Sequence, residues 1–307
     1  MKVVCLSGGI GGAKLVAGLH DVLAPDELTV IGNVGDDLEV LGLHVSPDLD
    51  SVLYALAGLN DAERGWGREG ETWQALESAR AWGGEGWFML GDRDLGLHLV
   101  RSQALGRGET LSDVTARLVR AAGLRTKLLP ATDDRLRTYL VTPAGTLAFQ
   151  EWFVARRHED EVDALRYDGA DVSRPAPGVI EAIEEADAIV IAPSNPFVSI
   201  HPILAVPGIR EAIERRRVRC VAVSPLIGGR AIRGPLDRMM QRLLGGTTPA
   251  LVTMCYKRML DALVIDSADA TTETDGAVVV TDTLMRDREG ARRLAQTTLE
   301  AAMETPS

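Results

Sequence analysis

The sequence predicts an α/β protein with a Rossmann-like, doubly wound and mostly parallel sheet that is interrupted by helical insertions. The prediction starts at the N-terminus, where a short apolar strand over residues 2–6 leads into the glycine-rich run Ser7–Lys14. An apolar helix to about Leu23 and a second apolar strand over 28–32 follow. A strand, a glycine-rich turn, a helix and another strand, in that order, are typical of the start of a parallel sheet.

The rest of the chain continues this alternation of apolar strands and amphipathic helices. We expect further strands at 87–90, 136–142, 146–149, 187–192, 218–223, 262–265 and 277–281. We expect further helices at 50–58, 70–82, 95–105, 111–122, 178–185, 207–216, 235–243 and 288–303. No fixed-period repeat or long Ser/Gly linker divides the sequence, so residues 1–307 are predicted to form a single domain. A helical insertion at about 50–85 and an excursion at about 142–176 are expected within it.

The charge of the 307-residue chain is acidic and unevenly distributed. The net charge is −11, yet no lysine or arginine stands between Lys14 and Arg64. The acidic residues of that window are Asp21, Asp26, Glu27, Asp36, Asp37, Glu39, Asp48, Asp50, Asp61 and Glu63. Nucleic acids and anionic membranes bind basic surfaces, so neither is expected as a partner. We expect Asp36, Asp37, Asp48 and Asp50 to form one wall of a ligand crevice.

The cysteines and the apolar runs bear on the compartment. Cys5, Cys220 and Cys255 lie far apart in apolar stretches, without the spacing of a metal or redox site. They are interpreted as small buried side chains in a reducing environment. No signal peptide is recognised, and no apolar run approaches the ~20 residues of a membrane-spanning helix. The sequence therefore predicts a soluble, cytoplasmic protein.

The glycine-rich run is the first candidate site. Gly8, Gly9, Gly11 and Gly12 follow a strand and open a helix, where backbone amides can approach an anion closely. Lys14 would add a positive charge to a bound phosphate. The spacing matches neither the dinucleotide fingerprint nor a Walker loop. A tight turn that only permits close packing is the alternative interpretation.

The second candidate is the acidic sequence Ser46-Pro47-Asp48-Leu49-Asp50. Two aspartates two residues apart point the same way if the chain is extended, and paired carboxylates can hold Mg²⁺ or accept a proton from a hydroxyl. We therefore take Asp48 and Asp50 as candidate metal ligands and catalytic groups. The alternative is that Asp50 caps the next helix and Asp48 is solvated.

Polar residues after an expected strand give the third candidate. Gly91-Asp92-Arg93-Asp94 follows the apolar run 87–90, and polar groups beyond a parallel strand fall in the ligand crevice. Arg93 is a candidate catalytic residue there. His98, one helical turn after Asp94, would face the same crevice. Trp66, between two glycines, is a candidate platform for a planar ligand. A turn with a local ion pair is the alternative for 91–94.

Two later strand ends carry the remaining candidates. Ser194 and Asn195 lie between two prolines and offer hydrogen-bond donors. A Gly-Gly turn with two arginines follows the strand at 218–223, and such a set suits a diphosphate. We therefore expect nucleotide and phosphate binding by Ser194, Asn195, Gly228, Gly229, Arg230 and Arg233, together with the first glycine loop.

Six motifs in this order resemble the 2-phospho-L-lactate transferase family, also described as the phosphoenolpyruvate transferases of deazaflavin-coenzyme biosynthesis. The resemblance spans nearly the whole chain. It rests on Ser7–Lys14, Ser46-Pro47-Asp48-Leu49-Asp50 with Val52-Leu53-Tyr54, Gly91-Asp92-Arg93-Asp94, Pro193-Ser194-Asn195-Pro196, Ser224-Pro225-Leu226-Ile227-Gly228 and Asp282-Thr283-Leu284-Met285.

The resemblance implies a reaction and its partners. The acceptor would be the deazaflavin Fo, 7,8-didemethyl-8-hydroxy-5-deazariboflavin, whose ribityl hydroxyl attacks a guanosine diphosphate ester of lactate or of enolpyruvate. GMP would leave, in coenzyme F-420 biosynthesis, with Mg²⁺ required and a homodimer as the assembly. The family's Fo-contacting positions match Asp50 and Arg93, and we add Trp66 and His98. Donor binding beside Asp48 and Asp50 should need Mg²⁺, because donor and site are both anionic.

Two other classes remain as alternatives at this stage. Proteins known as gluconeogenesis factors share the opening glycine loop and the strand-end motifs, and would make this chain a sugar-nucleotide-binding regulator without turnover. A nicotinamide-dependent oxidoreductase is disfavoured because Asn33 stands where a ribose-binding acid would follow the second strand.

Overall fold

The fold is built on one parallel sheet of seven strands. A computed structural model describes residues 1–272, 274 and 276–304, and its sheet has the order β14-β13-β10-β9-β1-β2-β5. Every neighbouring pair in this sheet is parallel, which confirms the predicted fold class. The strands are β1 (Val3–Ser7), β2 (Leu28–Gly32), β5 (Lys127–Pro130), β9 (Ala188–Ile191), β10 (Cys220–Val223), β13 (Ala262–Asp266) and β14 (Ala277–Thr281).

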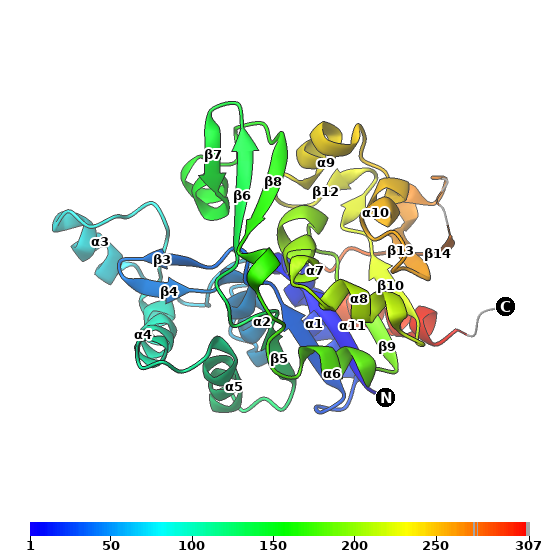
Figure 1. The fold of residues 1–307 in the computed structure, drawn as a ribbon, viewed down its shortest axis with the longest axis horizontal. Helices are drawn as coiled ribbons and strands as arrows, with labels where there is room; N and C mark the ends of the chain where they lie inside the picture. The colour runs from blue at the N-terminus through cyan, green and yellow to red at the C-terminus, as the bar shows by residue number, and fades with distance from the viewer. Residues whose placement is uncertain (273, 275, 305–307) are drawn as a thin grey trace.

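The chain reverses its direction of winding between β1 and β9. It runs from β1 through β2 to β5 at one edge, then returns to β9 on the other side of β1 and continues to β14. The helices that accompany these strands are α1 (Gly9–Val22), α6 (Val179–Glu184), α7 (His201–Ala205), α8 (Ile209–Arg215), α9 (Leu236–Leu244), α10 (Pro249–Cys255) and α11 (Arg288–Met303). Figure 1 shows α1 and α11 on one face of the sheet and α6 and α8 on the other. Ligands of such sheets bind beyond the carboxyl ends of the strands at the reversal point.

The central strands are buried from both sides because helices cover both faces. β1, β9, β10 and β13 are buried along their whole length, which explains why they are continuous apolar runs rather than alternating patterns. Cys5 pairs with Val30 of β2 and Val190 of β9, at the centre of the core. Cys5 and Cys220 are fully buried and Cys255 is partly buried, all as free thiols. None of the described helices has the length and apolar character to span a bilayer.

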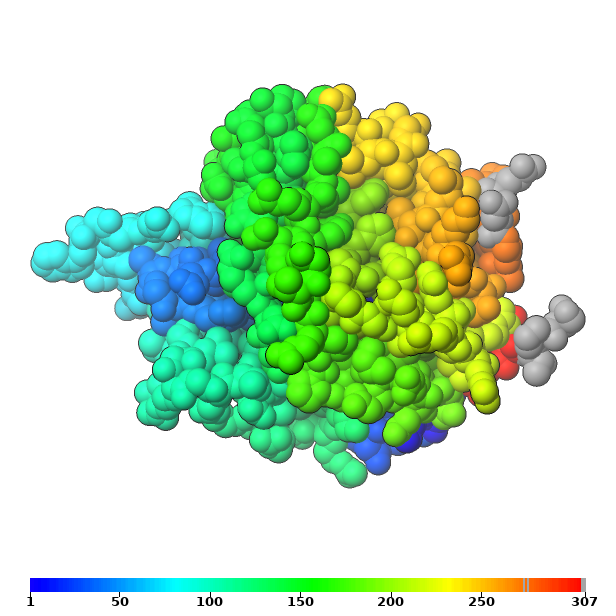
Figure 2. Space-filling model, viewed as in Figure 1, coloured from blue at the N-terminus to red at the C-terminus, as the bar shows by residue number. Residues whose placement is uncertain are grey.

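The segment between β2 and β5 leaves the sheet and forms a helical lobe. It contains a hairpin of β3 (Leu38–Val40) and β4 (Leu43–Val45), and the helices α2 (Pro47–Ala57), α3 (Gln74–Ala81), α4 (Asp92–Gly106) and α5 (Leu111–Ala121). Helix α2 packs against α1 and belongs to the core, although the insertion was expected at about 50–85. Helix α3 projects from the body of the molecule (Figure 2).

A small antiparallel sheet spans residues 137–168 and overlaps part of the excursion expected at about 142–176. Its order is β7-β6-β8, formed by β6 (Arg137–Thr142), β7 (Gly145–Ala148) and β8 (Ala164–Asp168). A π-helical turn, Glu151–Ala155, connects β7 to the loop before β8. A second π-helical turn, Pro196–Ile200, follows β9, and a short hairpin pairs β11 (Leu226–Ile227) with β12 (Arg230–Ala231). Single 3-10 turns occur at Ala170–Val172 and Ser267–Asp269.

The prediction of a strand at 87–90 was wrong. These residues form an irregular segment before α4, and Leu90 is buried among Val40 and Val45 of the β3–β4 hairpin. A short apolar run can be buried by packing on a hairpin as well as by joining a sheet, and periodicity does not separate the two. The sequence interpretation also omitted the hairpin itself, β5, β8, β11, β12, α7 and α10.

Helices α1 and α11 touch through a glycine, and this contact gives a test of the packing. A methyl group at Gly18 would lie 2.2 Å from the Ala291 carbonyl oxygen. Gly18→Ala should therefore lower the free energy of unfolding by about 1–3 kcal/mol, as overpacking does. Urea denaturation measures this, with Gly96→Ala of α4 as the control.

Gly96 is a matched helical glycine, because a methyl group there meets nothing within 4 Å. Gly96→Ala should stabilise the protein by up to about 1 kcal/mol through helix propensity. Equal effects of the two substitutions would contradict the α1–α11 contact.

Candidate functional site

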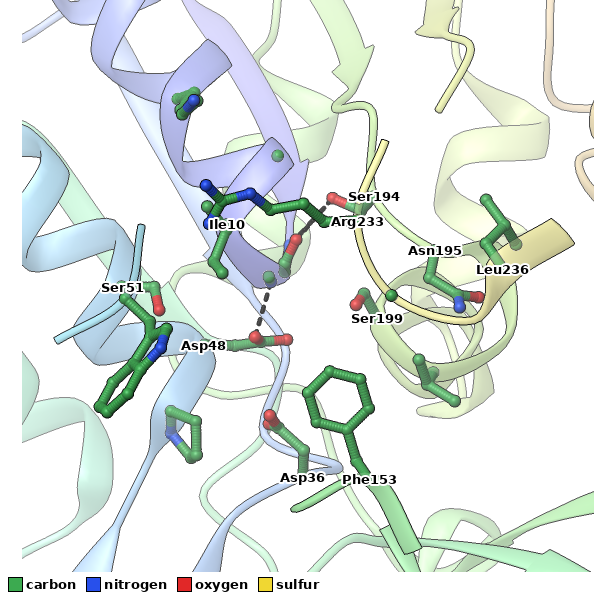
Figure 3. Close-up of a pocket in the computed structure, with 18 of the residues that line it drawn as sticks. Ile10, Asp36, Asp48, Ser51, Phe153, Ser194, Asn195, Ser199, Arg233 and Leu236 are labelled. Carbon is green, nitrogen blue, oxygen red and sulfur yellow. Dashed lines mark hydrogen bonds between the residues drawn. The ribbon is translucent and has the colours of Figure 1, made fainter. Parts of the chain in front are cut away.

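One cavity lies at the point where the sheet reverses. It has a volume of about 730 Å³ and is lined by the loops that follow β1, β9 and β10 and by residues of α2 and α4. Figure 3 shows Ile10, Asp48, Ser194 and Arg233 around its centre. Of the residues proposed from the sequence, the cavity is lined by Gly8, Gly9, Gly11, Lys14, Asp48, Asp50, Trp66, His98, Ser194, Asn195 and Arg233.

The glycine loop owes its composition to close packing. A methyl group at Gly11 would lie 2.6 Å from the Pro193 carbonyl oxygen, and one at Gly12 would lie 2.5 Å from the Ser194 hydroxyl. The loops after β1 and β9 therefore fit together only without side chains at these positions. Gly12 supports this contact but does not line the cavity. Helix α1 has neither a side-chain cap nor an acid in its first turn.

Asp48 lies against the start of α1. Its Oδ1 accepts a hydrogen bond of 2.6 Å from the Gly9 amide, and its Oδ2 accepts one of 2.9 Å from Asn33 Nδ2 (Figure 3 shows the Gly9 contact). Asn33 also donates to Asp36 at 3.3 Å, so one amide group links two buried carboxylates. Burial raises the pKa of Asp48 to about 6. Burial and the neighbouring Asp48 and Asp37 carboxylates raise the pKa of Asp36 well above its usual range.

Asp50 belongs to a separate cluster. Arg101 of α4 is buried and donates to both Asp50 oxygens, with 3.0 Å for its Nη1 bond, and His98 Nδ1 lies 3.7 Å from Asp50 Oδ2. Burial lowers the pKa of His98 to about 4, so the ring is neutral at pH 7. Asp48 and Asp50 therefore do not form the side-by-side pair that an extended chain would give. Both lie in the first turn of α2, where residues two apart project from different sides.

Basic side chains from three segments of the chain line the cavity. Lys14 of α1 donates to the Met285 carbonyl at 3.0 Å, and Arg233 donates to the Arg64 carbonyl at 3.1 Å. Burial and the nearby Arg233 lower the pKa of Lys14. Arg64 forms an ion pair with Asp61. Among the described residues, Lys14 and Arg233 donate to backbone carbonyls and form no ion pair with a carboxylate. The two cations are thus available to an anionic ligand.

Several residues proposed from the sequence lie outside the cavity lining. The amides of Gly228 and Gly229 both donate to the Asp269 carboxylate at 2.9 Å, so the turn already holds an anionic group of the protein. Arg230 lines a neighbouring surface groove. Arg93 is exposed and donates to the Glu69 carbonyl.

Asp37, expected in the crevice wall, also lies outside the lining. Its carboxylate contacts His44 Nε2 and accepts from Ser46 Oγ, both at 2.9 Å. Asp36, Asp48 and Asp50 of the predicted wall do line the cavity. Asp37 instead contacts His44 of the β3–β4 hairpin, and no pattern in the local sequence predicts this contact.

Aromatic and apolar side chains cover another part of the lining. Trp66 stacks under the Arg64 guanidinium, 4.7 Å from ring centroid to carbon, and is 40% exposed. Phe149 and Phe153 stack on each other beside the π-helical turn, with ring centroids 5.4 Å apart. The cavity therefore combines cations and a helix N-terminus with carboxylates and with flat apolar surfaces, which suits a ligand that is both phosphorylated and aromatic.

The family follows from a comparison with known proteins. The model of the family 2-phospho-L-lactate transferase CofD matches residues 3–301. The chain belongs to this family. It is thus an Fo transferase of coenzyme F-420 biosynthesis, as the motifs predicted, and a regulator without turnover is not favoured.

Similar proteins cover the whole chain. A phosphoenolpyruvate transferase of Streptomyces griseus is 42% identical, with 99% of both chains covered. One of Kitasatospora aureofaciens is 44% identical, with 98% of each covered. The crystal structure of a UPF0052 family member from Bacillus halodurans covers 99% of both chains with a TM-score of 0.63. It is 20% identical, and that likeness concerns the fold alone.

The transferase site contains residues that the sequence interpretation missed. Arg101, Tyr54 and Gln150 are side chains of this kind, and Gln150 donates to Asp36 at 3.1 Å. The sequence could have indicated Arg64 as a site residue, because it is the first basic residue after the long stretch without lysine or arginine. The sequence indicated Arg101 more weakly, because it lies one turn after His98 on the same face of the helix.

The Asp50–Arg101 pair can be tested through stability. Arg101→Met should lower the free energy of unfolding by about 3–5 kcal/mol, because it leaves the Asp50 carboxylate buried without its partner. Adding Asp50→Asn to this variant should restore much of the loss, since the remaining group is then neutral. Denaturant unfolding of the two single variants and the double variant measures the coupling. Additive losses would contradict a direct pair.

Proposed function

We propose that this enzyme transfers a phosphoenolpyruvyl group from a guanosine diphosphate ester to the terminal ribityl hydroxyl of Fo, releasing GMP. The observation that carries the proposal is one cavity in which Lys14, Arg233 and the start of α1 lie near the buried Asp36–Asp48 pair. The cations suit the diphosphate of the donor, and the carboxylates suit activation of a hydroxyl.

The choice of donor rests on the relatives. Those of Streptomyces griseus, Kitasatospora aureofaciens and Thermobifida fusca are named phosphoenolpyruvate transferases, at 41–44% identity. The family name refers instead to 2-phospho-L-lactate. We therefore propose the enolpyruvyl ester as the donor and keep the lactyl ester as the comparison substrate.

The residues fit a magnesium ion as a partner of the donor. Among the described residues, no set of three or more His, Cys, Asp or Glu side chains forms a complete metal site. Mg²⁺ commonly uses one or two carboxylates and completes its shell with water and substrate phosphates. Asp48 and Asp36 would hold it, in place of the Asp48–Asp50 pair proposed from the sequence. When bound, it would supply charge neutralisation to the diphosphate.

The chain's own groups have distinct tasks in the proposed transfer. Lys14, Arg233 and the amides of α1 that follow Gly9 bind the diphosphate and favour the charge that develops on it, because Asp48 already accepts from the Gly9 amide. The hydroxyl oxygen attacks the phosphorus that bears the enolpyruvyl group, and the bond from that phosphorus to the GMP phosphate oxygen breaks. The hydroxyl proton passes to a carboxylate oxygen of the Asp36–Asp48 pair, which lines the same cavity.

Other features of the proposal come from the family resemblance. Asp50 and Arg93 are its Fo-contacting positions, and Arg101 fixes the orientation of the Asp50 carboxylate. Arg93 lies outside the cavity lining, so its side chain has to change conformation to contact Fo. We also propose a homodimer in the cytoplasm, as the resemblance implies.

The transfer assay tests the function directly. Incubation with Fo, Mg²⁺ and the enolpyruvyl donor should release GMP and increase the mass of Fo by one phosphoenolpyruvyl group. The lactyl donor should give a lower kcat/KM under the same conditions. Mass spectrometry and nucleotide chromatography provide the readout. GMP release without a change in Fo would indicate hydrolysis instead of transfer.

Donor binding should depend on Mg²⁺ through Asp36. We expect GDP, used as a donor analogue, to bind about tenfold or more weakly when chelator replaces Mg²⁺, because two buried carboxylates then repel the phosphates. Asp36→Asn should remove much of this metal dependence.

Asp37→Asn is the matched control, because the Asp37 carboxylate faces His44 and Ser46 outside the cavity. It should keep most of the metal dependence, because Asp37 acts on Asp36 only through its charge and does not line the cavity. Isothermal titration calorimetry measures all three proteins, and equal GDP affinity with Mg²⁺ and with chelator in the unsubstituted enzyme would contradict the proposal.

A further inference from the structure

One carboxylate of the cavity lacks the hydrogen bonds that the others have. Asp94 of α4 lines the cavity and is 7% exposed, and its buried Oδ1 accepts no hydrogen bond from the described residues. By contrast, Asp48 accepts bonds from Gly9 and Asn33, and Asp50 accepts bonds from Arg101. A buried carboxylate without donors is costly, so its retention points to a donor that arrives with a ligand.

A hydroxyl without a partner lies beside this carboxylate. Tyr54 of α2 also lines the cavity, is 3% exposed, and its hydroxyl has no hydrogen-bond partner among the described residues. Burial, followed by the nearby Asp50 and Asp94 carboxylates and by the contact of the hydroxyl with Asp94, raises the pKa of the Tyr54 phenol. The phenol therefore stays protonated and can donate. The Tyr54 hydroxyl and the Asp94 carboxylate thus lie close to each other without a well-formed hydrogen bond between them, and both can bind a ligand.

This pair lies away from the phosphate-binding residues. The groups around Asp94 are Tyr54, Glu71, Asp50 and Arg68, whereas Asp48 contacts Gly9 and Asn33. A methyl group on Gly67 would lie 3.5 Å from Asp94 Oδ2, which places the carboxylate next to the Trp66 segment. The pair therefore belongs to the part of the cavity that has flat apolar surfaces.

We propose that Asp94 and Tyr54 together bind the imide edge of the planar acceptor. Asp94 accepts a hydrogen bond from the ring N–H, and Tyr54 donates one to the adjacent ring carbonyl. An imide presents a donor and an acceptor side by side, which matches the unused acceptor and donor of the protein. The proposal rests on Fo being the acceptor, because a deazaflavin carries such an imide in its pyrimidinedione ring.

The geometry gives the pair a role in specificity. A ring substituted on the imide nitrogen would leave Asp94 buried without a donor, and sites that hydrogen-bond a substrate reject analogues lacking that group strongly. The ribityl chain is attached to the nitrogen of the central ring and not to the imide. Binding the imide at Asp94 therefore leaves the ribityl chain free to reach the phosphate-binding part of the cavity.

Asp94→Asn and Tyr54→Phe test the proposal, because both keep the shape of the side chain. Asp94→Asn should raise the KM for Fo by roughly 10- to 100-fold, as expected for a lost charge-assisted bond. Tyr54→Phe should raise it by about tenfold. In both variants kcat should change by less than the KM, and GDP affinity should stay unchanged.

Thermal unfolding separates ligand binding from a structural role. Without ligand, the Tm of Asp94→Asn should equal or exceed that of the unsubstituted enzyme at pH 7.5, because an unpartnered buried charge has been removed. If Tyr54 and Asp94 served only to bond each other, both substitutions would lower the Tm and leave the KM for Fo unchanged. That result would overturn the proposal.

Asp92→Asn on the same helix is the matched control. The Asp92 carboxylate accepts bonds from Thr72, Gln74 and Ala75, so its substitution should lower the Tm and leave the KM for Fo within about twofold. Fo methylated on the imide nitrogen supplies the second control. It should bind the unsubstituted enzyme far more weakly than Fo does, and Asp94→Asn should discriminate less between the two.

These outcomes are distinguishable from failure of the proposed function. If the unsubstituted enzyme does not modify Fo, the transfer assay fails before any variant is compared. If it modifies Fo and N-methylated Fo with the same KM, the transferase function stands and the imide contact is wrong.

Discussion

The site depends on the close approach of the loops that follow β1 and β9. Gly11 meets the Pro193 carbonyl and Gly12 meets the Ser194 hydroxyl, at distances that leave no room for a side chain. This contact sets the start of α1 at the point where the sheet reverses, and it forms one wall of the cavity. Asp48 accepts a hydrogen bond from the Gly9 amide, and this contact positions the start of α2 beside the start of α1. The glycines are thus needed mainly for close packing of the two loops. As a consequence of that packing, their backbone amides lie near the ligand cavity.

The second constraint is the burial of several carboxylates in one cavity. Each is treated differently: Asp50 is held by Arg101, Asp36 and Asp48 share Asn33, and Asp94 has an unsatisfied oxygen. A buried charge is tolerated when it is paired, hydrogen-bonded or partly neutralised. The cavity therefore contains one carboxylate that is neutralised by an arginine and others whose charge a ligand can compensate. This arrangement explains why an acidic chain can serve an anionic substrate, provided that cations stand opposite.

Much of the core fold could be predicted, because strands buried on both faces are continuous apolar runs. β1, β2, β9, β10 and β13 were recognised in this way, and so were most helices. The exceptions are short or lie outside the main sheet. Residues 87–90 form an equally apolar run, but they pack on the β3–β4 hairpin instead of joining the sheet. β5 was missed, although it pairs with β2 at the sheet edge, because its four residues carry little periodic signal.

The sequence by itself determined the family, the parallel sheet and the strand ends at which the site forms, because these depend on local patterns of glycine, apolar and acidic residues. Only the tertiary structure decided which of those residues meet. The Gly228–Gly229 turn has the composition of an anion site, but Asp269 from a later segment occupies its amides. Asp48 and Asp50 are neighbours in sequence, yet a helix turns them toward different partners. Contacts such as Asp50 with Arg101 join residues 51 positions apart. Spacing along the chain carries no record of them, because they form only when packed elements bring distant side chains together.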